Sequence, residues 1–361
     1  MMWPYYVMVG IPAVVALFGK KFFNHKLRNR LVVISFFLIW FILLCFRHEK
    51  VGVDVLNYQM LFKKTFTMSF GEIFARSFDS RFELGFNLLA KIVSVTTGNF
   101  RVYLVLIALL SLAPVFLLYF YCARENAYLS IVIFLSLGLF SIYFSALRQV
   151  IAVAFAVPAF YFTKKRKPLL FLLMVFLAFL THHSALIMLL LYPVYHLNMR
   201  IKSNLIILIP VIALVYFFRV PIFEWLTVFL NDFYSSNIKE TGAVLIFVLL
   251  MGFLILSYIF PDNSKLDKET IGLRNLLFLC TVLQIFSGIN SIAMRMNYYF
   301  LIFVPLLIPR IINNTTEKNK KVAMIVYLVM VVFFTFWYFY RAYTSADILN
   351  VYPYIPAWAK Y

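Results

Sequence analysis

The chain has 361 residues, of which 64% are hydrophobic and only 13% charged, and its mean hydropathy is +0.92. No soluble domain of this length has such a composition, so we predict an all-α, polytopic integral membrane protein. The formal net charge of +19 does not indicate nucleic acid, because the lysines and arginines form short clusters between apolar runs and not one polar face.

The first apolar run, residues 3–18, is predicted to be a retained helix, because it lacks the basic region and the small-residue cleavage site of a signal peptide. The basic cluster from Lys20 to Arg30 comes after it, and such clusters usually face the cytoplasm. The N-terminus is therefore predicted to lie outside, and a second helix over residues 31–46 returns the chain to the outer face.

Residues 47–101 are predicted to form one larger outer-face segment, since they carry mixed charges and only half-length apolar pieces. Within it, residues 84–97 are too few for an ordinary span and are expected to dip into or lie on the outer leaflet. Two pieces each place one carboxylate among apolar and aromatic neighbours. They are GVDVLNY, which contains Asp54, and FELGF, which contains Glu83.

Ten further apolar runs predict the remaining helices: residues 102–122, 128–144, 150–163, 168–181, 184–197, 205–218, 243–260, 275–289, 296–309 and 322–340. Together they give a single transmembrane domain over residues 1–361 with about twelve helices, within a range of ten to thirteen. More than half of the 33 lysines and arginines then fall in inner loops, and both termini lie outside. The three cysteines, Cys45, Cys122 and Cys280, stand singly in apolar runs and are interpreted as packing residues.

Residues 145–186 predict a membrane hairpin whose tight turn, residues 164–167, reads KKRK. At 1.5 Å per residue, the two helices climb and return by roughly 22 Å and roughly 21 Å. Arg148 therefore comes to the same depth as His182 and His183. An arginine beside Gln149 and two adjacent histidines are costly near hydrocarbon, and such residues usually line a bundle interior or a water-filled cavity.

The unusual polar residues collect at the outer ends of the predicted helices: Asp54, Glu83, Arg148, His182, His183, Arg295 and Arg341. Each has an ordinary explanation by itself, because helix-end arginines often reach toward headgroups and a lone histidine usually packs. Their convergence on one side favours a site for an anionic amphiphile. Guanidinium groups bind phosphate oxygens through two parallel hydrogen bonds, and histidine accepts a proton near neutral pH.

At these residues the chain resembles the EpsG family of Wzy-type polysaccharide polymerases. The resemblance is carried by GVDVLNY, FELGF, LRQVIA, THHSAL, RMNYYF and the C-terminal NVYPY, in this order along nearly the whole chain. It implies a GT-C-like glycosyltransferase bundle in the bacterial inner membrane, with its site facing the periplasm. It also implies an enzyme that joins undecaprenyl-diphosphate-linked oligosaccharide repeat units into O-antigen, capsule or exopolysaccharide.

By the same resemblance, Arg148, Gln149 and Arg295 are expected to bind the diphosphate, and one histidine to be catalytic. His183 is the preferred general base, because small residues follow it and allow a close approach, whereas His182 ends a bulky run. His182, Asp54 and Glu83 are the alternative bases. Tyr58, Tyr298 and Arg341 are expected to contribute further substrate contacts.

We expect no cofactor and no metal, because the chain shows neither metal-ligand spacing nor a glycine-rich nucleotide loop. The expected partners are the lipid-linked oligosaccharide, as donor and acceptor, the lipid bilayer and a chain-length regulator protein; nucleic acid is not among them. A flippase for the same lipid should show related halves or broken helices in corresponding positions, and neither is found in the sequence. A membrane acyltransferase normally places its donor face inside, whereas these histidines map outside.

The predicted topology is tested with single introduced cysteines and a membrane-impermeant maleimide. Cysteines at Asn57 and Ser236 should react in intact cells, whereas cysteines at Asn198 and Asn314 should react only after lysis. Labelling at Asn198 in intact cells would overturn the topology and move the proposed site to the other face.

Overall fold

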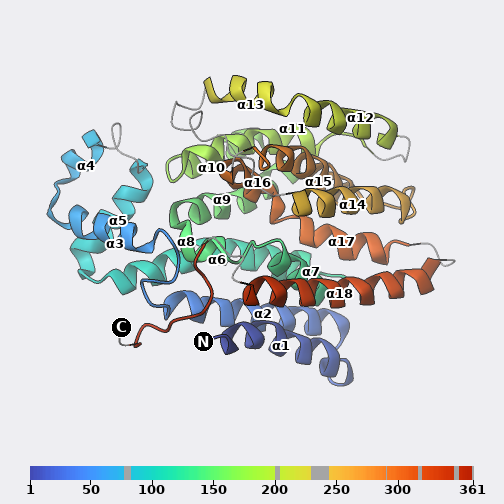
Figure 1. Ribbon diagram of the computed structural model, residues 1–361, viewed down its shortest axis with the longest axis horizontal. Coiled ribbons are helices and arrows are strands. Elements are labelled where there is room, and N and C mark those ends of the chain that lie inside the picture. Colours follow the sequence, from blue (N-terminus) through green and yellow to red (C-terminus); the bar gives the residue numbers. More distant parts are fainter. Residues whose placement is uncertain are drawn as a thin grey trace. The chain divides into compact units, whose positions relative to one another are not determined.

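The computed structural model describes residues 1–76, 83–199, 204–228, 244–289, 291–315, 319–344 and 349–359 (Figure 1). Within these residues the regular structure is entirely helical, and the chain divides into two compact units. The first unit is Met1–Phe162, Leu169–Leu186 and Val329–Tyr361, and the second is Thr163–Pro168 and Ile187–Leu328. The single transmembrane domain stays a prediction.

Most of the first half of the chain belongs to the first unit. Its helices are α1 (Trp3–Phe18), the 3-10 turn η1 (Gly19–Lys21), α2 (His25–Cys45), α3 (Val55–Thr67), α4 (Phe70–Arg76), α5 (Leu84–Thr97), α6 (Phe100–Cys122), α7 (Ala127–Ser136), α8 (Ile142–Ser145) and most of α9 (Leu147–Lys164) and α10 (Pro168–Phe179). The C-terminal part of α18 (Lys320–Tyr343) joins them.

The first unit is built around α2, which packs against α1, α6 and α7. Trp40 of α2 is fully buried, and its ring lies 4.6 Å from the ring of Tyr143 and 5.4 Å from that of Phe134. Aromatic side chains bury large apolar areas and pack edge to face, which suits the contacts between helices. Part of the high aromatic content of the sequence therefore fills helix contacts.

Asparagine caps decide where three of these helices, α2, α6 and α7, begin. The Asn24 side chain accepts a hydrogen bond from the backbone N–H of Leu27 at 2.8 Å, and Asn99 caps α6 in the same way through Arg101. Such caps satisfy N–H groups that a helix start leaves without partners. Helix α2 therefore begins at His25, and the predicted start at residue 31 is wrong: part of the basic cluster lies on the helix.

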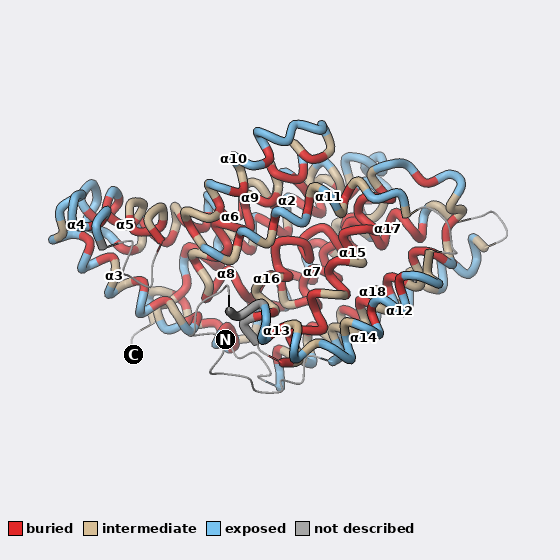
Figure 2. The backbone as a smooth tube through the Cα atoms, turned by 90° about the horizontal axis from the view of Figure 1, so that it is seen from above, coloured by how far each residue is buried: buried red, intermediate tan, exposed pale blue. Residues whose placement is uncertain are grey.

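The second unit contains η2 (His183–Leu190, a 3-10 helix divided between the units), α11 (Leu191–Tyr195), α12 (Asn204–Phe217), α13 (Arg219–Val228), α14 (Val244–Ile259), α15 (Lys268–Phe286), α16 (Ser291–Leu301) and α17 (Val304–Asn313). Helix α15 is its centre, packs against all of these helices from α11 on, and is buried along nearly its whole length (Figure 2). Asp267 caps α15 through the N–H of Thr270 at 2.8 Å, so α15 begins before the predicted residue 275.

Three predicted helices are broken in the structure. The predicted helix over residues 128–144 is α7, a turn and the short α8, and the one over residues 184–197 is η2 followed by α11. The predicted helix over residues 296–309 is α16 and α17, which meet at an angle of 46°. Pro305 lies in the first turn of α17, where its missing N–H costs no helical hydrogen bond.

Among the described residues, five helical segments are long and apolar enough to cross a membrane, or seven if each of two bent pairs counts as one span. The five are Trp3–Lys21, His25–Cys45, Phe100–Cys122, Lys268–Phe286 and Lys320–Tyr343. The chain thus has the helices of an integral membrane protein, while the count of twelve spans, the GT-C-like bundle and the sidedness stay predictions. Ser236, proposed above for labelling, lies outside the described residues.

Candidate functional site

One buried carboxylate, that of Glu83, joins three separate parts of the first unit. Its side chain is only 4% exposed, and its Oε2 accepts a hydrogen bond from Arg148 Nη1 at 2.7 Å. Its Oε1 accepts hydrogen bonds from His182 Nδ1 at 2.9 Å and from the backbone N–H of His183 at 3.2 Å. The structure thus brings the FELGF, LRQVIA and THHSAL elements together around a single side chain.

A backbone contact holds this arrangement in place. The N–H of Gly85, in the first turn of α5, donates to the carbonyl oxygen of Leu180 just after α10, at 2.7 Å. A Cβ at residue 85 would lie 2.8 Å from that oxygen, so only glycine allows the approach. The contact also satisfies one of the N–H groups that the start of α5 leaves without a helical partner. Glu83 is consequently fixed next to His182.

A hydrophobic cluster from α3, α5, α6 and α9 supports the site. Its buried members are Val55, Tyr58, Phe62, Phe86, Ala90, Val93, Phe100, Tyr103, Leu104, Ile107, Leu147 and Ile151. Tyr58 packs edge to face on Phe86 at 5.3 Å, and its hydroxyl interacts with the Arg148 guanidinium. Close packing of this kind leaves the polar groups above it little freedom to rearrange.

The charges around Glu83 keep it ionised. Burial raises the pKa of Glu83, but the hydrogen bond from His182 and the positive charge of Arg148 outweigh burial, and the pKa falls from 4.5 to about 2. Such a carboxylate is a weak proton acceptor near neutral pH. Of the alternative bases named above, Glu83 is therefore better suited to orient its partners than to accept a proton.

The two histidines differ in their surroundings. The His182 side chain is 12% exposed, and its hydrogen bond to an ionised carboxylate requires the proton on Nδ1, which places the lone pair of the neutral ring on Nε2. The His183 ring is exposed and packs on Phe179 with ring centroids 4.8 Å apart. The geometry favours His182 as the proton acceptor, opposite to the preference drawn from neighbouring residue size.

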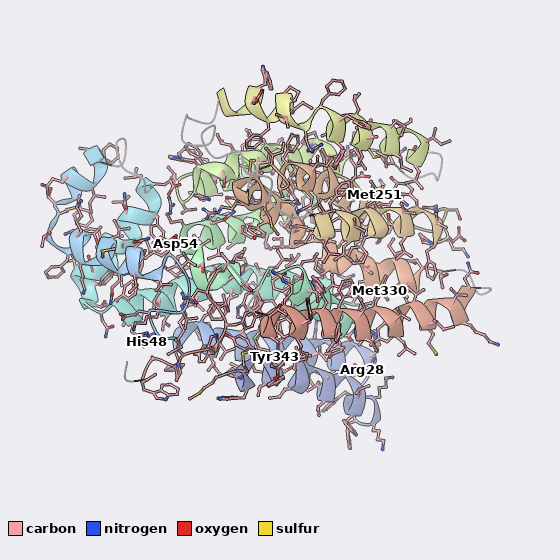
Figure 3. All side chains as sticks on the ribbon, in the orientation of Figure 1. Arg28, His48, Asp54, Met251, Met330 and Tyr343 are labelled. Atoms are coloured by element: carbon pink, nitrogen blue, oxygen red, sulfur yellow. The ribbon has the colours of Figure 1, made fainter. Side chains whose placement is uncertain are left out.

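Asp54 and Gln149 flank these residues. Asp54 is half-buried at the start of α3, one helical turn before Tyr58 (Figure 3). It occupies the N-cap position, but its side chain does not cap the helix. Gln149 follows Arg148 on α9 and is 2% exposed.

The remaining predicted site residues are not among those that contact Glu83. Arg341, near the end of α18, donates from Nη1 to the carbonyl oxygen of Ser136 in α7 at 3.4 Å. Arg295 and Tyr298 belong to α16 of the second unit, where Arg295 is half-buried and Tyr298 is buried. Among the described residues no group of three or more His, Cys, Asp or Glu side chains could hold a metal ion, and the absence of a metal requirement stays a prediction.

Sequence reasoning missed the groups that build the site from the backbone. The contact between Gly85 and Leu180 could have been suspected from the glycine in FELGF, whereas no sequence signal pointed to Leu180.

Comparison with known proteins gives one match. The model of the EpsG family matches residues 29–355, which is nearly the whole chain and includes every residue of the Glu83 cluster. Neither the curated proteins nor the solved structures give a match.

Replacing Glu83 by glutamine tests whether the ionised carboxylate stabilises the fold. Because folding lowers the pKa of Glu83 from 4.5 to about 2, its charge stabilises the protein fully above about pH 4.5, and this contribution disappears as the pH falls towards 2. The contribution is on the order of 3 kcal/mol. In melting experiments on purified protein, the difference in melting temperature between wild type and Glu83→Gln should be present at pH 5 and should shrink as the pH falls from there towards 2.

Glu49→Gln is the control, because Glu49 is a half-buried glutamate in the same segment of the sequence. It should leave the melting temperature close to that of the wild type. A difference in melting temperature between wild type and Glu83→Gln that does not change with pH would contradict the ionised state of Glu83.

Proposed function

We infer the function of this chain from its family and its site: it belongs to the EpsG family, whose members are polysaccharide-polymerase-like membrane proteins. We propose that it is a Wzy-type glycosyltransferase that joins undecaprenyl-diphosphate-linked oligosaccharide repeat units into a surface polysaccharide. In this proposal the protein is a twelve-helix, GT-C-like bundle in the bacterial inner membrane, and the Glu83 cluster faces the periplasm. A chain-length regulator is a proposed further partner.

The observation that carries this proposal is the single carboxylate shared by Arg148 and His182. A polymerase that releases a lipid diphosphate must bind an anion and must also remove a proton from the incoming hydroxyl. Glu83 fixes a guanidinium and an imidazole at a set separation, so both tasks are served by one preorganised group of residues. The match of the EpsG family over the same residues supports this interpretation.

In the proposed reaction, a hydroxyl oxygen of the acceptor sugar attacks the anomeric carbon of the sugar attached to the donor diphosphate. The new glycosidic bond forms while the bond from that carbon to the diphosphate oxygen breaks, and the electron pair leaves with the diphosphate. The proton of the acceptor hydroxyl moves to Nε2 of His182. Glu83 holds the Nδ1–H tautomer and stabilises the imidazolium that results.

Arg148 is the proposed diphosphate ligand. Its side chain keeps 19% exposure, and a guanidinium has five N–H donors, more than the Glu83 carboxylate occupies. Diphosphate is already a good leaving group, so charge neutralisation and positioning are the main contributions that the protein must make. Gln149, Arg295, Tyr298 and Arg341 remain proposed substrate contacts that rest on the sequence resemblance.

The function is tested by deleting the gene and reading glycan chain length on a gel. Loss of a polymerase leaves single-unit products, and re-expression of the wild-type chain restores the ladder of long products. Arg148→Lys keeps the charge but loses the planar, two-pronged donor, so it should insert normally and reduce polymerisation at least tenfold.

Arg166→Lys makes the same substitution in the exposed turn and should restore the full ladder. A deletion strain without any surface product would instead identify a flippase. Normal chain length with Arg148→Lys would remove this residue from the proposed diphosphate site.

The base is tested with purified protein, lipid-linked repeat units and two alanine variants. His182→Ala should lower the rate by roughly 10²–10⁴-fold, the usual contribution of general base catalysis. His183→Ala should keep most of the activity, since residue 183 meets Glu83 through its backbone N–H, which alanine retains. The wild-type rate should fall at acidic pH, because protonation removes the acceptor lone pair of histidine.

Glu83 does not account for such a fall, since its pKa is about 2. A rate that stays flat down to pH 5, or a fully active His182→Ala enzyme, would exclude His182 as the base. A loss of activity in His183→Ala alone would return that role to His183.

A further inference from the structure

The C-terminal residues 349–359, here called the C-terminal strap, run without helix along the beginning of the chain. The N–H of Ala357 donates to Phe46 O at 2.7 Å, and the N–H of His48 donates to Ile355 O at 2.8 Å. The Tyr5 hydroxyl donates to Val351 O, deep in the first unit. The strap contains NVYPY, an element of the family resemblance that the proposed reaction leaves without a role.

The strap, the turn before α3 and the end of α8 meet at one junction. The carbonyl oxygen of Leu349 accepts hydrogen bonds from Val53 N–H at 3.2 Å and from Ser145 Oγ at 2.8 Å. The Val53 N–H also donates to Ser145 Oγ at 3.1 Å, so Val53, Ser145 and Leu349 form a closed triangle of hydrogen bonds. Ser145 is 1% exposed, and a buried hydrogen bond of this kind is costly to break.

Gly52 makes the junction possible. Its φ of +101° lies in the region that favours glycine, and a Cβ there would lie 1.9 Å from the carbonyl oxygen of Phe144. The turn therefore rests directly on the backbone of α8. Asp54 follows Val53 at once, and Arg148 is three residues after Ser145, so the hydrogen bond from Val53 to Ser145 links the residues just before α3 to those just before α9.

Because Asp54 directly follows Val53, the junction fixes the position of the Asp54 backbone at the start of α3. Asp267 occupies the same N-cap position on α15 and caps its helix through Thr270, as aspartate usually does, whereas Asp54 does not cap α3. Within the described part of the chain, no hydrogen bond or ion pair to the Asp54 carboxylate is found. A half-buried carboxylate is a strong acceptor for a hydroxyl donor, and sugars present such donors at every carbon that carries a hydroxyl.

We propose that Asp54 binds a hydroxyl of the acceptor sugar, and that Ser145 and the C-terminal strap are positioning elements that hold Asp54 at the start of α3, one helical turn before Tyr58. This inference rests on the proposed function. It assigns the GVDVLNY and NVYPY elements to the acceptor side of the site, apart from the residues that hold the diphosphate.

The test compares Ser145→Ala with Ser136→Ala in purified protein. Ser136 is equally buried and donates to Phe334 O at 2.7 Å, so it ties α7 to the C-terminal helix without meeting Val53. The acceptor probe is the free repeat-unit oligosaccharide, released from its lipid, because it carries the sugar hydroxyls without the diphosphate. Ser145→Ala should raise the acceptor KM about tenfold, the effect of losing one or two buried hydrogen bonds.

The KM for the lipid-linked donor should stay near the wild-type value in Ser145→Ala. Asp54→Asn should also raise the acceptor KM, Ser145→Thr should restore it, and Ser136→Ala should leave it unchanged. An unchanged acceptor KM in both Ser145→Ala and Asp54→Asn, or an equal rise for donor and acceptor, would overturn the proposal.

A second measurement does not depend on the proposed function. A cysteine at Asp54, in a Cys122→Ser background that removes the half-buried native thiol, is labelled with maleimide, and the rate is compared with and without Ser145→Ala. Loosening the junction should speed labelling several-fold, whereas Ser136→Ala should not change it. Equal rates would refute the positioning role.

These two measurements separate the two possible failures. If the wild-type protein does not lengthen glycans, the proposed function fails, while the labelling rates still decide whether the strap positions residue 54. If Ser145→Ala protein cannot be recovered, Tyr5→Phe replaces it in both measurements. This variant removes a hydrogen bond to the strap that lies outside the junction.

Discussion

A carboxylate that is almost fully buried must be matched by partners, and this constraint organises the first unit. Glu83 is 4% exposed, and its two carboxylate oxygens accept hydrogen bonds from Arg148, from His182 and from the backbone N–H of His183. An unpaired charge there would cost several kcal/mol. The starts of α5 and α9 and the end of α10 must therefore meet at one point, and the contact between Gly85 and Leu180 provides the backbone geometry for that meeting.

In the described part of the second unit, buried and half-buried charged groups link helices to one another. Arg274 is fully buried and donates to Ser257 O at 3.1 Å, Asn263 Oδ1 at 2.6 Å and Met199 O at 2.5 Å. Glu269 is bridged by Lys164 at 2.5 Å and Arg310 at 2.8 Å. These charge-assisted hydrogen bonds and ion pairs tie helices together. The Glu83 cluster differs because it contains an imidazole, a group that can serve as an acid or a base.

The site and the C-terminal strap both depend on contacts between the ends of helices. Helix ends expose carbonyl and N–H groups that their own helix cannot satisfy, and other segments can bind to them there. Leu180 O, at the end of α10, and the backbone of residues 52 and 53, just before α3, are used in this way. The polar residues of the site thus stand on a frame of backbone hydrogen bonds, with the apolar cluster around Tyr58 and Phe86 beneath it.

The sequence by itself determined the membrane class, most helices and the approach of Arg148 to the histidines. The hydropathy pattern and helix-breaking residues predicted α1 and α5 with the bounds that the structure has. The rise per residue of a helix predicted that Arg148 and His182 come to the same depth. Helix starts at His25 and Lys268 were missed, because caps such as Asn24 and Asp267 lie outside the apolar runs. Only the tertiary structure decided which histidine meets Glu83 through its ring, since adjacent residues look alike in a hydropathy pattern. It also decided the contact between Ser145 and Leu349, because residues 204 positions apart are paired by folding and leave no local pattern.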